Sequence, residues 1–229
     1  MKPSPVASRQ LIFTVIKFYL LAAALLMLLF FLPAGTFQYW QAWVYMVVIL
    51  GPMLLVMVYL LRNDPELLAR RMQFRERAAD QNLITRLSIL PFLAAFILPG
   101  FDRRFGWSHV PVWLAVTGQL LVLSGYVINF LVFRENSYAS RIVEVSEGQT
   151  VISSGPYAIV RHPMYLGVML LYRLSPLALG SYWGMIPALM IIPFIIVRII
   201  SEEKLLVKEL KGYAEYRQKV RYRLIPGIW

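Results

Sequence analysis

The sequence predicts an all-α, polytopic membrane protein. Hydrophobic residues make up 59% of its 229 positions, charged residues make up only 15%, and the mean hydropathy is +0.62. The apolar residues are gathered into runs of about 17 to 22, the length that a helix needs to cross the ~30 Å hydrocarbon core of a bilayer. The chain has no cysteine, which excludes disulfides, thiolate metal sites and cysteine nucleophiles.

About five to six membrane segments are expected. The first run is longer than the core of a typical signal peptide and no small-residue cleavage site follows it, so we expect it to remain in the protein. The third and fifth runs are short, which leaves a tilted, shallow or proline-broken helix open for each. Gly180-Ser181 between the last two runs predicts a helical hairpin. The predicted segments are 11–32, 40–61, 83–98, 113–133, 164–179 and 182–200.

The distribution of Lys and Arg predicts the orientation of these segments. Twenty of the 23 basic residues lie at the amino terminus and in the stretches 62–86, 134–163 and 198–229. Placing these four regions in the cytoplasm satisfies the positive-inside rule and makes both termini cytoplasmic. The net charge of +11 is then explained by topology and by attraction to anionic lipid, so nucleic acid is not an expected partner.

Two connecting stretches carry signals of local structure. Asn63 or Asp64 is placed to cap a short interfacial helix at the start of the stretch 62–86. Farther along, the β-branched residues of 142–143 and 150–152 flank a Glu-Gly turn. This pattern predicts a short extended or hairpin segment.

The stretch 155–167 is polar and turn-rich, between two long hydrophobic runs, and it contains His162. Gly155-Pro156-Tyr157 interrupts regular structure and leaves backbone amides available to a ligand. Pro163 fits the first turn of a helix, because proline loses no hydrogen bond there, and the amides of that turn would face His162 and Tyr165. A binding pocket can form at this helix start. His109, in contrast, has no partner at metal-ligand spacing.

A second polar group lies where the last hydrophobic run meets water. Arg198 is followed by Glu202 and Glu203. Carboxylates stabilise free helix N-termini, but this helix is continuous with the membrane segment and has no free N-terminus there. A cationic or hydroxyl-bearing ligand is the better explanation for these carboxylates.

These features together resemble the isoprenylcysteine carboxyl methyltransferase family of integral membrane enzymes. The resemblance rests on Gly-Pro-Tyr, Arg-His-Pro-x-Tyr-x-Gly, Arg198 with the two glutamates, Tyr213-x-x-Tyr216 and a basic tail ending at Pro226, and it covers roughly residues 118–229. It implies one membrane methyltransferase domain over 1–229. Residues 11–133 would form variable membrane helices, and residues 134–229 would form the catalytic region with a small cytoplasmic cofactor-binding cap.

The resemblance also implies S-adenosylmethionine as the methyl donor, bound on the cytoplasmic side, and a lipophilic or small acceptor that enters from the bilayer. The implied catalytic residues are Arg198 and Glu202. Substrate-binding candidates are Arg198, Asn136 and Arg173. The implied cofactor-binding residues are Gln149, Thr150, Val151, Ile152, Tyr157, His162, Pro163, Met164, Tyr165, Glu202 and Glu203.

The chemistry of methyl transfer is consistent with this division. Glu202 can accept from hydroxyls or an ammonium group, and Tyr157 and Tyr165 can face a sulfonium through cation–π attraction. Glu203 is a candidate for the same ligand or for an ion pair with Arg198. An ionised carboxylate acceptor needs no general base and fits a two-pronged contact with Arg198. A thiol or amine acceptor needs a base, for which His162 or a glutamate is available.

Several alternatives stay open on sequence alone. A phospholipid N-methyltransferase or a small-thiol S-methyltransferase would use nearly the same donor site. A nicotinamide-dependent membrane reductase of the steroid-reductase type can have a similar carboxyl-terminal region, and a non-enzymatic lipid-binding protein could keep the scaffold. Arg173, a charge at membrane depth, fits either an acceptor-binding cation or a side chain that reaches the membrane surface.

Overall fold

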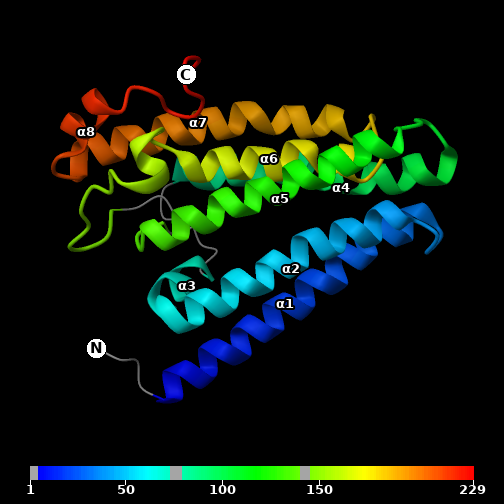
Figure 1. The fold of residues 1–229 in the computed structure, drawn as a ribbon, viewed down its shortest axis with the longest axis horizontal. Coiled ribbons are helices and arrows are strands. Elements are labelled where there is room, and N and C mark those ends of the chain that lie inside the picture. Colours follow the sequence, from blue (N-terminus) through cyan, green and yellow to red (C-terminus); the bar gives the residue numbers. More distant parts are fainter. Residues whose placement is uncertain (1–4, 73–78, 140–144) are drawn as a thin grey trace.

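The computed structural model describes residues 5–72, 79–139 and 145–229, with the side chains of 5–8 and 79–85 outside the description. The described chain is helical and contains no strand. Figure 1 shows long helices running side by side, with α1 and α2 crossing below the others. The short helices α3 and α8 both lie at the left end of this view, together with the segment that precedes α6.

All six predicted membrane segments are helical. They correspond to α1 (Pro5–Ala34), α2 (Trp40–Asn63), α4 (Ala79–Phe105), α5 (Val112–Glu135), α6 (Pro163–Ala178) and α7 (Met185–Glu209). Within the described residues, four helices are long and apolar enough to cross a membrane, namely α1 from Arg9 onward, α2, α5 and α7. With 16 residues, α6 is about 24 Å long, which is less than the ~30 Å hydrocarbon core.

The local signals at two helix starts are confirmed. Helix α3 (Pro65–Arg71) begins after Asp64, whose Oδ1 accepts a hydrogen bond from the Leu67 amide at 2.9 Å. Helix α6 begins at Pro163, as expected from the conformation that proline imposes. The predicted Glu-Gly turn is confirmed at Glu147–Gly148, where Gly148 has a φ of +71°. Residues 145–152 form no strand, and residues 142–144 lie outside the described part.

Helices α5 and α6 pack so closely that glycine is required between them. A Cβ added at Gly125 would lie 2.7 Å from the Gly167 carbonyl oxygen, and one added at Gly118 would lie 2.8 Å from the Ala178 nitrogen. Both distances are shorter than real Cβ contacts allow. Because α6 starts at the predicted site, this contact fixes the site relative to the membrane helices.

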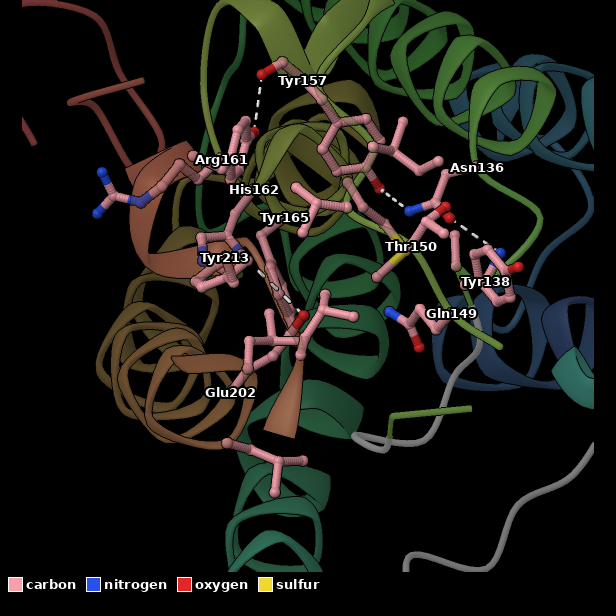
Figure 2. A pocket seen from close by; sticks show the side chains of 18 of the residues that line it. Asn136, Tyr138, Gln149, Thr150, Tyr157, Arg161, His162, Tyr165, Glu202 and Tyr213 are labelled. Atoms are coloured by element: carbon pink, nitrogen blue, oxygen red, sulfur yellow. Dashed lines mark hydrogen bonds and ion pairs between the residues drawn. The ribbon is translucent and has the colours of Figure 1, made fainter. Parts of the chain in front are cut away.

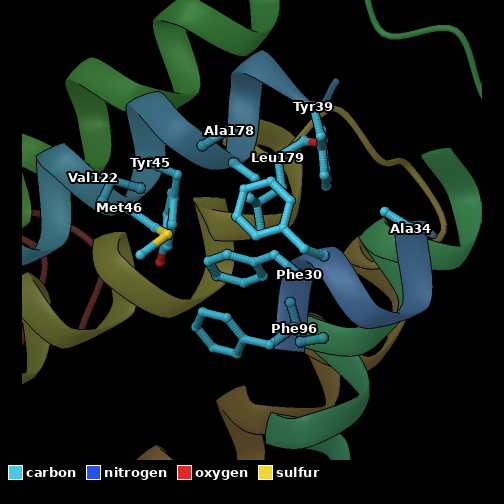
Figure 3. Packing of buried hydrophobic residues seen from close by; sticks show 13 residues of the cluster. Phe30, Ala34, Tyr39, Tyr45, Met46, Phe96, Val122, Ala178 and Leu179 are labelled. Carbon is cyan, nitrogen blue, oxygen red and sulfur yellow. The ribbon is translucent and has the colours of Figure 1, made fainter. Parts of the chain in front are cut away.

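The largest apolar core of the described residues joins all six long helices, α1, α2, α4, α5, α6 and α7. Figure 3 shows Phe30 beside Tyr45 and Phe96, and their ring centroids are 5.6 Å and 6.2 Å from that of Phe30. The hydroxyls of two tyrosines in this core form hydrogen bonds inside the bundle. Tyr45 shares a 2.5 Å hydrogen bond with the Ser175 hydroxyl, and Tyr39 donates to the Leu179 carbonyl at 2.6 Å. The rings therefore fill the core without leaving these two hydroxyls unpaired.

The connections at the other end of the bundle are tied by Asp102. This carboxylate is only 1% exposed, and it accepts from the Ser108 amide at 2.7 Å and from the Ser181 hydroxyl at 2.5 Å. Ser181 belongs to the turn between α6 and α7, where Gly180 has a φ of +79°. The predicted helical hairpin is thus confirmed, and Asp102 attaches it to the end of α4.

Candidate functional site

An open pocket lies at the end of the bundle where α6 starts and α7 continues beyond its hydrophobic run. Figure 2 shows side chains from several separate chain segments converging on it. Its lining residues come from the segment after α5, from 149–152, from 157–165, from α7 and Leu210 just beyond it, and from α8 (Tyr213–Lys219).

Most of the predicted site residues line this pocket. Only Pro163, Arg173 and Glu203 of that set do not. Residues separated by more than 60 positions in the sequence therefore meet at one place. The predicted residues that line the pocket are Asn136, Gln149, Thr150, Val151, Ile152, Tyr157, His162, Met164, Tyr165, Arg198 and Glu202.

Tyr165 connects the cation and the carboxylate of α7. Its hydroxyl donates to Glu202 Oε2 at 2.6 Å and accepts from Arg198 Nε at 3.1 Å. Arg198 and Glu202 are four residues apart and so lie on the same face of the helix. His162 Nδ1 is 3.9 Å from Glu202 Oε1. The pocket therefore contains a guanidinium, a phenol, an imidazole and a carboxylate within reach of one ligand.

Glu203 has a different role from the one expected of it. Its side chain is 5% exposed, and its oxygens bond to Arg161 Nε at 2.6 Å and to Arg223 Nε at 2.8 Å. His162 Nε2 is 3.3 Å from the same carboxylate. Because these groups surround it beneath the pocket wall, Glu203 acts as an anchor and is not placed to contact a ligand in the pocket.

The carboxyl-terminal tail holds the Arg-His-Pro motif by its backbone. The Arg161 and His162 amides donate to the Tyr222 and Arg223 carbonyls at 3.0 and 2.9 Å. Arg161 Nη1 donates to the Val220 and Arg221 carbonyls at 2.8 and 2.7 Å. The sequence marks this basic tail only as part of a motif, and the structure shows that its backbone supports Arg161 and His162.

Tyr157 is fixed from two sides. The Asn136 amide group donates to its hydroxyl at 2.8 Å, and the Tyr216 hydroxyl donates to its backbone carbonyl at 2.7 Å. Burial raises the pKa of Tyr157 to about 12, so its ring stays neutral at physiological pH. Asn136, predicted to bind substrate, lines the pocket and also orients this aromatic ring.

Arg173 is not brought to the pocket. It is exposed on α6, eight residues after Tyr165, which places it about 12 Å farther along the helix axis. The expectation that it binds the acceptor next to Arg198 therefore gains no support from the arrangement. Pro163 also lies outside the lining, although it starts the helix that carries Met164 and Tyr165.

Helix α3 braces the pocket from the amino-terminal half of the chain. Arg71 Nη1 donates to the Ala139 carbonyl at 2.8 Å and lies 3.8 Å from the Met164 sulfur. The Arg71 guanidinium carbon is 4.1 Å from the centre of the Phe133 ring, a cation–π distance. Ala139 and Met164 both line the pocket, and no pattern in the sequence predicts this long-range contact.

The prediction also missed an apolar wall of the pocket. The predicted site includes no residue of α7 after Glu203. In the structure this face turns toward the pocket, together with the two tyrosines of α8. The unpredicted lining residues are Tyr138, Ala139, Arg161, Leu205, Leu206, Leu210, Tyr213 and Tyr216.

Comparisons with known proteins agree with this geometry. Residues 113–212 match the sequence model of the phospholipid methyltransferase family. A solved structure of the eukaryotic intramembrane Ras methyltransferase ICMT (isoprenylcysteine carboxyl methyltransferase), without a monobody, has 16% sequence identity and a TM-score of 0.50 over 99% of this chain and 88% of that one. A comparison with curated proteins gives no match. The family match includes most of the pocket lining, and the structural match shows that the fold extends over the whole chain.

Proposed function

We propose that the chain is a membrane methyltransferase that transfers a methyl group from S-adenosylmethionine to the carboxylate of a lipophilic, isoprenylcysteine-like acceptor. The match of residues 113–212 to the phospholipid methyltransferase family supports this reaction class. One observation carries this proposal. Arg198 and Glu202, joined through the Tyr165 hydroxyl, face the same pocket at the end of a helix long and apolar enough to cross a membrane.

The chemistry of the lining fits the donor. S-adenosylmethionine combines a sulfonium, an ammonium, a carboxylate, a ribose and an adenine. Glu202, whose side chain is 23% exposed, can accept from the ammonium or the ribose hydroxyls. The neutral rings of Tyr157 and Tyr165 can face the sulfonium, and backbone amides at the start of α6 can take the carboxylate.

Arg198 is the proposed acceptor-binding cation. Its guanidinium can hold a carboxylate by two parallel hydrogen bonds, which fix the direction of the attacking oxygen. That oxygen forms a bond to the methyl carbon as the carbon–sulfur bond breaks, and the electron pair stays on sulfur. The products are a methyl ester and a neutral thioether. No proton has to be removed, so orientation and exclusion of water are the main demands on the protein.

The distribution of charge supports a site on the cytoplasmic face. The pocket lies at the end of the bundle that also contains α3, α8 and the segment before α6 (Figure 1). These segments belong to three of the four basic stretches of the chain. A donor from the cytosol would then meet an acceptor that arrives from the adjacent leaflet.

A phospholipid N-methyltransferase is the second candidate, and the family match favours it. A protonated amine must lose a proton before it can attack the methyl group, so this reaction needs a base. Glu202 and His162 are the available groups in the pocket. The two candidates differ in the acceptor and in the stability of the product.

Acceptor identity can be tested with the purified full-length chain in lipid nanodiscs and donor labelled in its methyl group. The acceptors to compare are an N-acetylated S-farnesyl cysteine and phosphatidylethanolamine. We expect label in the cysteine derivative, and we expect mild base to release it as methanol because the product is an ester. Base-stable label in the phospholipid would instead establish the second candidate.

The role of Arg198 can be tested in the same assay. Arg198→Gln should raise the KM for the carboxylate acceptor about 10- to 100-fold, the effect of losing a charged hydrogen-bonding partner. It should leave the affinity for the donor largely intact. Arg198→Lys is the matched control, since it keeps the charge without the two-pronged geometry. An unchanged acceptor KM in Arg198→Gln would contradict the assignment.

A further inference from the structure

The pocket tyrosines differ in how their hydroxyls are satisfied. Tyr165 donates to Glu202, Tyr138 donates to the Gly148 carbonyl, Tyr216 donates to the Tyr157 carbonyl, and Tyr157 accepts from Asn136. The Tyr213 hydroxyl, in contrast, is buried and has no hydrogen-bond partner among the described residues. Buried polar groups in native proteins are nearly always paired, and an exception in a pocket wall points to a partner that comes from outside the chain.

The ring of Tyr213 belongs to an apolar cluster at the junction of α7 and α8. It packs with Leu210 and Tyr216, and the partly buried side chains around them are those of Val145, Val151, Leu206 and Val220. The Tyr213 and Tyr216 ring centroids are 5.7 Å apart. Tyr213, Tyr216, Val151, Leu206 and Leu210 all line the pocket, so this end of it offers two aromatic rings and aliphatic walls to a flat, apolar group.

The Tyr213 hydroxyl remains a hydrogen-bond donor at physiological pH. Burial raises the pKa of Tyr213, and the negative charges of Glu203 and Glu202 raise it further. The Tyr213 hydroxyl thus lies between carboxylates and an apolar cluster. This position suits a ligand that has a polar part joined to an apolar part. A nucleoside has that character, since its ribose carries hydroxyls and its base has apolar faces with a polar edge.

The order of groups along α7 indicates which end of the donor belongs here. Leu206 lies eight residues after Arg198 and therefore about 12 Å farther along the helix, away from the membrane-length hydrophobic run. If the acceptor carboxylate is held at Arg198, the transferable methyl group must be at that end of the pocket. The two other substituents of the sulfonium, the nucleoside and the aminocarboxylate chain, then lie deeper in the pocket. The aromatic rings and aliphatic side chains near α8 fit the nucleoside and not the charged aminocarboxylate.

We propose that Tyr213 is a binding residue for the adenosine half of the methyl donor, with the adenine packed in the cluster of Tyr213, Tyr216, Leu206 and Leu210 and the Tyr213 hydroxyl bonded to the nucleoside. This inference rests on the proposed function. Among the pocket tyrosines, Tyr213 is the one whose hydroxyl makes no hydrogen bond to a described residue.

The experiment is a calorimetric titration of the full-length protein in detergent with two ligands. S-adenosylhomocysteine carries both halves of the donor product, and 5′-methylthioadenosine carries only the nucleoside half. Tyr213→Phe removes the hydroxyl and keeps the ring. We expect it to weaken both ligands by the same factor, about three- to tenfold, as for the loss of one hydrogen bond. Tyr182→Phe, at an exposed position in the distant α6–α7 turn, is the control and should bind both ligands as the wild type does.

The melting temperature of the ligand-free protein separates a binding role from a structural one. Tyr213→Phe should melt at the wild-type temperature or above it, because no described hydrogen bond is lost. Unchanged affinity for both ligands, weakening of S-adenosylhomocysteine alone, or a lower ligand-free melting temperature would each overturn the inference. If the wild type binds neither ligand, the proposed function fails as well; if only Tyr213→Phe behaves unexpectedly, the proposed function stands and the assignment of Tyr213 fails.

Discussion

Two adjacent carboxylates of α7 are placed in opposite environments. Successive residues on a helix point about 100° apart, so Glu202 faces the pocket while Glu203 faces the carboxyl-terminal tail. Glu202 bonds to Tyr165 and its side chain is 23% exposed. Glu203 is 5% exposed and bonds to Arg161 and Arg223. Ligand binding and structural support are therefore divided between neighbouring residues.

This division predicts opposite outcomes for two matched substitutions. Glu203→Gln should destabilise the protein by about 3–5 kcal/mol, because it leaves the buried Arg161 guanidinium without its counter-charge. Glu202→Gln should lower stability much less and should weaken binding of S-adenosylmethionine. Thermal melts in detergent and calorimetric titration measure the two effects. Equal loss of stability in both variants would contradict the assignment.

The different positions of Glu202 and Glu203 could not be predicted from the local sequence. Both follow the same hydrophobic run and both are compatible with a ligand or an ion pair. The difference depends on Arg161 and Arg223, which lie 42 and 20 residues away in the chain. Which of two neighbouring acids receives such a partner is decided by the packing of the tail and not by the residues around them.

At the scale of elements, the contact between α5 and α6 sets the position of the pocket. Gly125 and Gly167 allow the two backbones to meet. The site residues His162, Met164 and Tyr165 lie at the start of α6, and Asn136 lies just beyond the end of α5. Any separation of the two helices would therefore move opposite walls of the pocket apart.

Gly125→Ala should consequently destabilise the protein by about 1–3 kcal/mol, the usual range for overpacking. It should also weaken donor binding, because α6 must shift to accommodate the added methyl group. Gly51→Ala in α2 is the control, since a Cβ there meets no other atom within 4 Å and alanine favours a helix over glycine by ~1 kcal/mol. Melting temperatures and donor titrations of the two variants provide the test. A Gly125→Ala protein as stable as Gly51→Ala would refute the close contact.

Hydrophobic runs located the helices better than they located the helix ends. The predicted membrane segment covers 182–200, and helix α7 continues to Glu209, in agreement with the expected continuity of this helix at Glu202 and Glu203. Helix α4 is continuous through Pro91 and Pro99, so the proline-broken alternative for this segment is wrong. The six-segment pattern is thus correct as helices, and the number that cross the membrane stays a prediction.

At the scale of the whole molecule, the pocket and the connection between α6 and α7 lie at opposite ends of the bundle (Figure 1). The positive-inside distribution predicts that the pocket end is cytoplasmic. The absence of cysteine from the sequence makes this orientation directly measurable, because single cysteines can be added without any removal.

Tyr182→Cys and Arg217→Cys are suitable positions, since both side chains are exposed and they lie in the α6–α7 turn and in α8 respectively. A membrane-impermeant maleimide added to intact cells should label Tyr182→Cys alone. Arg217→Cys should become reactive only after the membrane is opened. Labelling of Arg217→Cys in intact cells would reverse the predicted topology and place the donor site on the wrong side for a cytosolic cofactor.

The two halves of the chain are less independent than a division at residue 133 suggests. The apolar cluster of Leu67 and Leu68 in α3 also contains Val132 and Phe133 of α5, and Tyr157 and Met164 pack against it. Arg71 adds polar contacts to Ala139 and Met164. The amino-terminal helices thus support the site. The predicted division into variable and catalytic regions does not include this support.

The sequence by itself determined the membrane class, the six helical segments, and the helix starts at Pro65 and Pro163. These follow from properties that are local in the chain: hydrophobic length, capping and the geometry of proline. The resemblance to a known family, which rests on local motifs, predicted eleven of the residues that meet in the pocket. The tertiary structure decided the anchoring role of Glu203, the support from the tail and from Arg71, the position of Arg173 outside the pocket, and the unpaired hydroxyl of Tyr213. Those features depend on which distant segments pack together, and packing is determined by contacts that no single stretch of sequence contains.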